Sequence, residues 1–433
     1  MSDSLEKLTV VGQTSGDFVG TDNSSIQNAI DSCNERGGGT VEVGPGTYQM
    51  NDSIHLKSGV KVRGAGEETV LRKSVMVKSG LSADLGYGHF DISLAEPEKF
   101  KAGMGVHVQD DNSGGFNTTV ATLTWQDGDR FGSSRFMNHD YSRERNTVVR
   151  SVFPVVSGYH LEDASIENLT IDGNRDENEY LNGCRGGGIF LLQASNVAIK
   201  NVTIRDYNGD GISFQQTRDV LIEDCLYENN SGHGLHPGSG SVRPVMRRVR
   251  CLNNTHDGIF YCLRVSFSLT EDCHLEGNGR YGISVGGRDT DHLIRNNTIM
   301  SNGMNGLYFR IADEAMGGHR CHFEGNTLFE NCTNEGYGEI FIDGETQDIH
   351  LLNNRITARA WAGDRPAIGI VVGEEASRIV AYGNEIEPSD ALHLDNRGEQ
   401  DSVSTDAPGE ALAVGPDAAP ADAGRHLVGS FEG

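Results

Sequence analysis

The densest group of titratable side chains lies between His233 and Ser241, where two histidines flank a Gly-Leu pair and small residues follow. Imidazoles change charge near neutral pH, so this segment is suited to proton transfer. Carboxylates and guanidinium groups stand at related positions in the neighbouring segments and would complete an acid–base site. The predicted catalytic residues are Asp210, His233, His236, Asp257, Arg264 and Arg310.

A second set of polar and aromatic residues follows the same positions and is typical of a binding face. For His233 or His236 alone, a turn residue or a solvated surface residue is an equally good interpretation. A stack of two histidines with carboxylates and arginines favours a functional site instead. The predicted ligand-binding residues are Gln215, Ser239, Arg243, Tyr261, Arg288 and Tyr308.

A repeat in the chain brings these residues into columns. Gly211, Gly234, Gly258, Gly282 and Gly306 fall 23, 24, 24 and 24 residues apart, and an apolar residue follows each. A period of this size is one turn of a solenoid. Alternate residues of a strand share a face, so the apolar residues should stack inward and their neighbours should point outward. The predicted inward stack is Ile212, Leu235, Ile259, Ile283 and Leu307.

A second column supports the same register. Nine residues before each glycine, and then with looser spacing, stand Val202, Cys225, Val249, Cys273, Asn297, Asn326, Asn354 and Asn384. Stacked asparagines at a corner would hydrogen-bond amide to amide and to the turning backbone. With the short Val/Ile-rich strands and glycine turns, this column predicts an all-β fold. The fold is a single-stranded right-handed parallel β-helix, a solenoid that rises about 4.8 Å per coil.

The chain divides into four stretches. Residues 1–79 should hold the first coils and an N-terminal capping helix that opens at Ser24-Ser25-Ile26-Gln27. Residues 80–157 interrupt the repeat. This interruption predicts an insertion that forms the wall of a groove, or a loop without function. Residues 158–395 are predicted coils. Residues 396–433 form an acidic Ala/Pro/Gly-rich tail, flexible or strapped along the solenoid, whose His426–Gly429 end docks back.

The composition narrows the range of partners. There are 62 Asp and Glu against 36 Lys and Arg, a net charge of -26, which argues against nucleic acid and anionic membrane as partners. The start of the chain has no signal-peptide pattern and no stretch is long enough to span a bilayer, which predicts a cytoplasmic protein, or a secreted one whose leader has been removed. The sequence is also compatible with an oligomeric state. Cys225 and Cys273, two coils apart at about 9.6 Å, are too distant for a disulfide and predict free thiols.

The stretch from Asp17 to Tyr48, with its helix, glycine turn and following strand, resembles the opening of the pectate-lyase-like β-helix superfamily. Asp172-Gly173-Asn174 resembles the point at which a first active-site loop leaves the helix in its members. The superfamily includes polygalacturonase-related proteins, rhamnogalacturonan-degrading enzymes, phage tailspikes and alginate C5-epimerases, so the resemblance implies a glycan partner. The epimerases carry a catalytic Tyr-Gly-Phe-Asp-Pro-His stretch, and neither segment 210–215 nor 233–238, which hold the equivalent place, reproduces it.

Three reactions and one binding role compete for the predicted site. Uronan β-elimination is favoured, with His233 or His236 as base and arginines that neutralise the substrate carboxylate. Inverting hydrolysis would use Asp210 and Asp257, about two strand spacings apart. C5-epimerisation and glycan binding without catalysis also fit these residues. No cofactor or metal site is predicted, although Asp289-Thr290-Asp291 offers two carboxylates that Ca²⁺ would accept.

Overall fold

The computed structural model describes residues 8–336, 338–360 and 366–424. These divide into two compact units, which are described separately. The first unit holds residues 8–191, 202–213 and 230–232, and the second holds residues 192–201, 214–229 and the described residues from 233 to 424. The predicted docking of His426–Gly429 lies outside the described residues.

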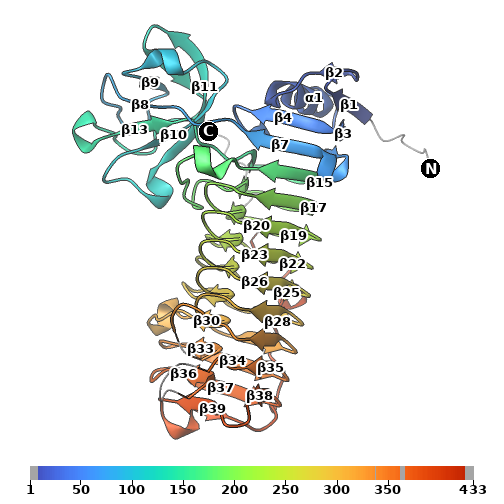
Figure 1. Cartoon of the computed structure of the whole chain (residues 1–433), viewed down its shortest axis with the longest axis vertical. Helices are drawn as coiled ribbons and strands as arrows, with labels where there is room; N and C mark the ends of the chain where they lie inside the picture. The colour runs from blue at the N-terminus through green and yellow to red at the C-terminus, as the bar shows by residue number, and fades with distance from the viewer. Residues whose placement is uncertain (1–7, 337, 361–365, 425–433) are drawn as a thin grey trace. The chain divides into compact units, whose positions relative to one another are not determined.

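The first unit begins with parallel strands that stack in consecutive coils (Figure 1). Strand β3 (Gly39–Val43) pairs in parallel with β1 (Leu8–Gly12) and β6 (Val60–Gly64). Helix α1 (Asn23–Glu35) buries the predicted apolar stripe of Ile26, Ala29, Ile30 and Cys33. The helix begins at Asn23, one residue before the predicted Ser24, because the Asp22 side chain accepts the hydrogen bond from the Ser24 N–H that caps the helix. Its role as an end cap stays a prediction.

The segment that interrupts the repeat folds as a separate antiparallel sheet with the strand order β8-β13-β10-β11-β12-β9 (Figure 1). It has its own core, in which Leu94, Val106, Leu123 and Phe131 are buried together. The coils resume at β14, which pairs in parallel with β5. The bounds are β5 (Ile54–His55), β8 (Lys78–Gly80), β9 (Asp91–Ser93), β10 (Gly105–Gln109), β11 (Thr119–Asp127), β12 (Arg130–Ser133), β13 (Val148–Arg150) and β14 (Val156–Tyr159).

The second unit is a stack of parallel coils, and one of its sheets carries the predicted repeat (Figure 1). Leu235, Ile259, Ile283 and Leu307 pair in one continuous register and are fully buried, so these four members of the predicted inward stack are confirmed. The fifth, Ile212, belongs to the first unit and is fully buried there. This sheet is called sheet B here. Its strands in this unit include β21 (Leu235–Gly238), β24 (Ile259–Phe260), β27 (Ile283–Val285), β30 (Leu307–Phe309), β33 (Ile340–Ile342), β36 (Ile368–Val372) and β39 (Leu392–Asn396).

The other long sheet, called sheet A here, is made of two short strands per coil that are separated by a corner. The residue at each corner is left-handed, such as Asn296 (φ 56°), Gly325 (φ 64°) and Asn353 (φ 54°). Strands before the corner are β19 (Arg218–Glu223), β22 (Val245–Arg247), β25 (Leu269–Glu271), β28 (Leu293–Arg295), β31 (Cys321–Glu324), β34 (Gln347–Leu352) and β37 (Ser377–Tyr382). Strands after it are β20 (Leu226–Glu228), β23 (Arg250–Leu252), β26 (His274–Glu276), β29 (Thr298–Met300), β32 (Thr327–Phe329), β35 (Arg355–Thr357) and β38 (Glu385–Glu387).

The repeated glycines of the second unit face the interior. A Cβ on Gly282 would lie 2.2 Å from the Ile299 side chain and 2.6 Å from the Gly306 carbonyl oxygen. A Cβ on Gly258 would similarly meet the Gly282 carbonyl oxygen at 2.7 Å. The 24-residue glycine signal therefore reflects close approach of successive coils, because any side chain there would overlap backbone atoms.

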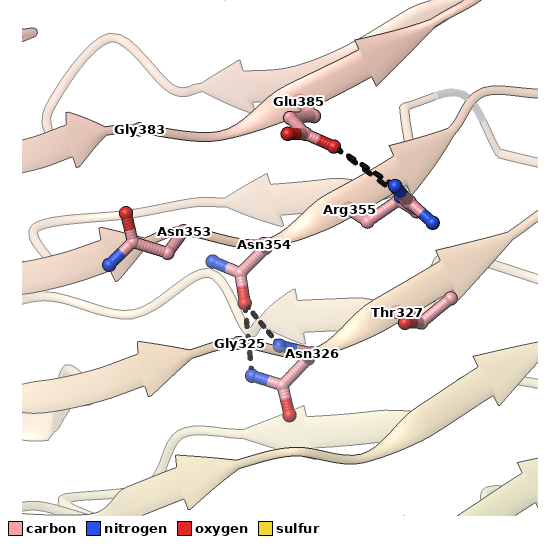
Figure 2. Close-up of a pocket in the computed structure, with 8 residues that line it drawn as sticks. All are labelled: Gly325, Asn326, Thr327, Asn353, Asn354, Arg355, Gly383 and Glu385. Carbon is pink, nitrogen blue, oxygen red and sulfur yellow. Dashed lines mark hydrogen bonds and ion pairs between the residues drawn. The ribbon is translucent and has the colours of Figure 1, made fainter.

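The predicted asparagine column is confirmed. Asn297 donates its amide to Asn326 at 2.8 Å, Asn326 to Asn354 at 3.0 Å, and Asn354 to Asn384 at 2.9 Å, and all four directly follow a left-handed corner. Figure 2 shows the Asn326–Asn354 link. A second ladder of the same kind, which was not predicted from the sequence, runs through Asn254, Asn278, Asn302 and Asn331.

The described part of the tail packs along the second unit. β40 (Val403–Ser404) pairs in parallel with β37, and the Gly415 N–H donates to the Asp291 carbonyl oxygen at 2.9 Å. Arg243 donates to the carbonyl oxygens of Pro420 at 3.5 Å and Ala423 at 3.4 Å. Of the two interpretations of the tail, these contacts favour the strap.

The cysteines agree with the prediction of free thiols, since Cys225 and Cys273 are buried and unbridged. Among the residues that the structure describes, no helix has the length and apolar character needed to cross a membrane.

Candidate functional site

One column of side chains points away from the core along sheet B of the second unit. It consists of His236, Phe260, Ser284, Tyr308 and Phe341, each following an inward residue of the paired register. This set is called the outward column. It is less open than the predicted binding face, because His236 is only 4% exposed and Ser284 is fully buried. Phe260, Tyr308 and Phe341 are partly exposed.

Aromatic contacts bury the two histidines. The His233 ring stacks on Phe260 with the centroids 4.3 Å apart and the planes 10° apart. His236 meets both rings edge-on, at 5.5 Å from His233 and 5.2 Å from Phe260. The backbone N–H of Asp257 donates to His233 Nδ1 at 3.2 Å, so the proton of the neutral ring is on Nε2. Neutral His233 is therefore a donor at Nε2 and has no free lone pair there to serve as a base.

Asp257 is fully buried and is held by the scaffold. Its carboxylate accepts from the Ser284 hydroxyl at 2.6 Å and from the Tyr281 N–H at 3.5 Å. His233 Nδ1 lies 3.8 Å and Arg280 Nε 3.7 Å from the carboxylate oxygens. Asp257 thus orients its neighbours and does not reach solvent.

Arg310 is also committed to the scaffold, which differs from its predicted role as a free cation. It donates to the carbonyl oxygens of Tyr261 at 2.6 Å and Cys262 at 3.1 Å, and its guanidinium lies 4.6 Å from the Phe260 centroid. Asp289 accepts from Arg310 at 3.4 Å. Burial raises the pKa of Asp289 to about 7, against the opposing charge of Arg310.

Four of the predicted residues stand at left-handed corners and not on the outward face. They are Ser239 (φ 45°), Arg243 (φ 55°), Arg264 (φ 55°) and Arg288 (φ 63°). Arg243 forms a two-pronged ion pair with Asp219 at 2.7 and 2.8 Å. Arg264 and Arg288, called the corner arginines here, occupy successive coils beside Cys262 and Gly286 and are exposed. Within the described chain, neither has an ion-pair partner.

The remaining predicted binding residues differ in their placement. Tyr261 was predicted wrongly, because its side chain is fully buried in the core and its hydroxyl contacts Ser268 at 2.9 Å. Gln215 is fully buried as well. Tyr308 lies on the outward column as predicted and stacks on Tyr281 at 4.6 Å, and its hydroxyl donates to Asp343 at 3.3 Å.

Asp210 belongs to the first unit, where it is fully buried and its carboxylate lies against Gly232. The same unit holds residues that the sequence analysis did not single out. Arg135 of the insertion lies 3.4 Å from the ring centroid of Tyr159 on β14, and Arg185 donates to the Phe116 carbonyl oxygen at 2.6 Å. Insertion and coils thus meet through arginine and aromatic side chains. No repeat or motif marks these residues, because the contacts join segments of unrelated spacing.

The two carboxylates considered for Ca²⁺ have other partners. Asp289 accepts from the N–H groups of Val265 at 2.8 Å and Gly286 at 3.1 Å. Asp291 forms a two-pronged pair with Arg320 at 2.7 and 2.9 Å. These contacts leave little charge for a cation, although metal binding itself stays untested.

A cavity of about 350 Å³ lies elsewhere on the second unit, at the corners of sheet A (Figure 2). Asn326 and Asn354 in its lining are used by the asparagine ladder, and Arg355 pairs with Glu385 at 3.3 Å. No histidine lines it, so it does not bear on the acid–base site.

Comparison with known proteins identifies the architecture. The sequence matches the model of the right-handed beta helix region over residues 137–299 and 265–403. The chain belongs to this β-helix family. No curated protein matches the sequence.

Solved structures similar to this β-helix protein have different roles. The A-module of the mannuronan C-5 epimerase AlgE4 from Azotobacter vinelandii has a TM-score of 0.53 at 15% identity, over 92% of this chain and 100% of that chain. The Dettilon tailspike protein has 0.55 at 13%, over 90% and 68%. The surface adhesin PfbA of Streptococcus pneumoniae has 0.52 at 15%, over 87% and 85%. At these identities the similarity shows the fold alone.

Proposed function

We propose that this β-helix protein acts on an acidic polysaccharide that lies across the outward column of sheet B, and that it cleaves the polysaccharide by β-elimination at a uronate. The observation that carries the proposal is the contact of His233 and His236 with the partly exposed Phe260 ring. The same stack of coils also carries the two exposed corner arginines, which have no ion-pair partner among the described residues. Sugar rings stack their C–H faces on aromatic side chains, and uronate carboxylates pair with guanidinium groups.

In the proposed reaction each of these groups has a separate role. His236 takes the proton from C5 of the uronate, the C4–O bond breaks, and a C4=C5 double bond forms while a proton reaches the leaving oxygen. His233 carries a proton on Nε2 and donates to a substrate oxygen. The corner arginines Arg264 and Arg288 neutralise the carboxylate so that negative charge can develop during proton removal. Arg310 positions Phe260.

Inverting hydrolysis has less support. That reaction needs two carboxylates that reach the substrate and a water molecule. Asp257 is fully buried and accepts hydrogen bonds from Ser284 and Tyr281. C5-epimerisation shares the proton removal and differs only in the later return of a proton to the opposite face.

Glycan binding without catalysis is the second candidate, and one observation favours it. His233 and His236 are 8% and 4% exposed, so a substrate reaches them only if Phe260 or a neighbouring group moves. Aromatic rings and arginines at the surface would still hold an acidic glycan. Among the structural neighbours, an epimerase, a tailspike and an adhesin share the scaffold, which supports either role.

The test is incubation of the protein with a panel of acidic and neutral polysaccharides. Ultraviolet absorbance of unsaturated uronates together with new reducing ends supports the lyase. New reducing ends without absorbance mean hydrolysis. Altered C5 configuration without cleavage means epimerisation, and binding without any product means a glycan-binding protein.

The corner arginines have a matched control. Arg264→Gln should raise KM and lower kcat, with a loss of kcat/KM of about tenfold or more for an acidic substrate. Arg378 is also exposed at a left-handed corner, but it pairs with Asp348 at 2.6 Å. Arg378→Gln should therefore leave kcat/KM unchanged, and equal losses in the two variants would contradict a specific role for Arg264.

A further inference from the structure

A fully buried lysine in the first unit has no acidic partner among the residues that the structure describes. Lys73 ends β7 (Thr69–Lys73), and its Nζ donates to Asn208 Oδ1 at 2.8 Å. The ammonium lies 5.0 Å from the ring centroids of Phe153 and Tyr207. Burial lowers the pKa of Lys73 well below its usual value. No described carboxylate forms an ion pair with it, so its charge lacks the partner that buried cations normally have.

A buried histidine, His107, stands on the strand whose Gly105 packs against the Phe153 ring, the ring that Lys73 also contacts. His107 on β10 stands opposite Arg150 on β13 in the antiparallel ladder. It is 2% exposed, and neither ring nitrogen has a hydrogen-bond partner among the described residues. Burial lowers the pKa of His107 to about 3, and the charges of Arg150 and Lys73 act in the same direction. The neutral ring therefore keeps one N–H donor and one acceptor nitrogen unsatisfied.

Arg150 adds a third unsatisfied group. Its Nε donates to Glu179, but its Nη1 is buried without a partner among the described residues. Glu179 also pairs with Lys78 at 2.6 Å, so it already serves two cations. Positive charge is thus in excess around His107.

We propose that Lys73, His107 and Arg150 bind a small oxyanion, such as inorganic phosphate, inorganic sulfate or the carboxylate of an organic acid. An oxyanion accepts hydrogen bonds from the imidazole N–H, from Nη1 and from the ammonium, and it supplies the missing negative charge. A water molecule would satisfy the imidazole but not the charge. The Arg150 side chain is 19% exposed, which leaves a route from solvent.

The site joins two parts of the first unit. Lys73 belongs to the coils, whereas His107 and Arg150 belong to the antiparallel sheet of the insertion. A bound oxyanion therefore stabilises the contact between the insertion and the coils. This inference does not depend on the proposed function.

The test uses the whole chain after dialysis into a chloride buffer. Phosphate, sulfate and acetate are titrated separately at constant ionic strength, with calorimetry and thermal unfolding as readouts. We expect saturable binding of at least one of them and a rise of Tm by about 2–4 °C at saturation. Preference for phosphate or sulfate over acetate identifies a tetrahedral anion, and the reverse identifies a carboxylate.

Variants separate a built site from a general salt effect. His107→Phe and Lys73→Met should weaken the binding at least tenfold, whereas Lys99→Met, which removes an exposed cation of the insertion, should bind as the wild type does. Arg150→Gln replaces a partly exposed side chain and serves if the two buried variants fail to fold. No saturable binding by the wild type, or the same response in Arg150→Gln, would overturn the proposal and leave the interior with water alone.

Discussion

The two sheets of the second unit present outward faces of opposite character, although they belong to the same coils. On sheet A, charges alternate from strand to strand, with Lys200, Glu223, Arg247, Glu271 and Arg295 paired in register. Their ion pairs run from 2.5 to 3.6 Å. On sheet B, the outward column holds histidine, serine and aromatic rings.

The difference between the two faces shows that one repeating backbone can carry both a face whose charges pair within the protein and a face that can bind a ligand. The charges of sheet A are satisfied within the protein, so this face offers a ligand little net attraction. The rings of sheet B and the corner arginines still have capacity to interact with a ligand. Function in a solenoid is therefore expected where successive coils fail to satisfy one another.

The largest expected effect comes from breaking the core that both faces share. Ile259→Asp would place a carboxylate in the fully buried stack between Leu235 and Ile283. The cost should be about 4 kcal/mol or more, because no partner for the charge is available there. Denaturant unfolding measures it. Ile259→Val, which keeps the apolar contact, should cost about 1 kcal/mol, and an equally small loss for the aspartate would mean that the stack is not buried.

The next largest effect is expected on catalytic activity, which a substitution on sheet B should lower and a substitution on sheet A should not. His236→Ala should lower kcat of the proposed elimination by about 10²–10⁴-fold through loss of the base. It should also cost about 1–2 kcal/mol in stability, since the ring is buried against His233 and Phe260. The control is His274→Ala on sheet A, where His274 pairs with Glu276 at 2.7 Å. If His236→Ala kept full activity on a substrate that the wild type cleaves, a residue other than His236 would be the base.

The sequence predicts the inward residues better than the outward ones, for a physical reason. Leu235 and its equivalents recur every 24 residues because each coil contacts only its neighbours. Burial of His233 depends on the ring of Phe260 in the next coil, and periodicity says nothing of ring stacking. Likewise, the spacing of Arg264 follows the 24-residue repeat. Its left-handed backbone, however, places it at a corner of the coil and not on the outward face.

The second asparagine ladder shows that periodicity can also predict buried polar residues. Asn254, Asn278 and Asn302 recur at the interval of the glycines, so the sequence carried a signal for them that the first asparagine column obscured. The contacts of Arg135 with Tyr159 had no such signal, since the insertion does not repeat.

Breaking the buried asparagine ladder should reduce the free energy of unfolding by an intermediate amount, because the ladder lies in the core that both faces share. Asn302 donates to the Leu275 carbonyl oxygen at 3.1 Å and to Asn331 at 2.8 Å, and it accepts from Asn278 at 2.9 Å. Asn302→Leu leaves these buried groups unsatisfied and should cost about 2–3 kcal/mol. Thermal unfolding measures the loss. Asn253→Ala, at an exposed corner one residue from the ladder, should cost less, and a reversed order would contradict the role of the ladder.

The smallest effect is expected on the charged face of sheet A. Glu271 pairs with Arg247 and Arg295; burial alone would raise its pKa, but the hydrogen bonds from the two arginines lower it. A lowered folded-state pKa contributes stability above the unfolded pKa of about 4.3, and this stability is lost as the pH falls through the folded pKa. Glu271→Gln should therefore cost about 1 kcal/mol at pH 7, less at high salt, and should flatten the acid limb of the stability curve. Cleavage of polysaccharide by Glu271→Gln should match the wild type, because this face already satisfies its own charges. A loss of activity without a loss of stability would show that sheet A, too, meets the substrate.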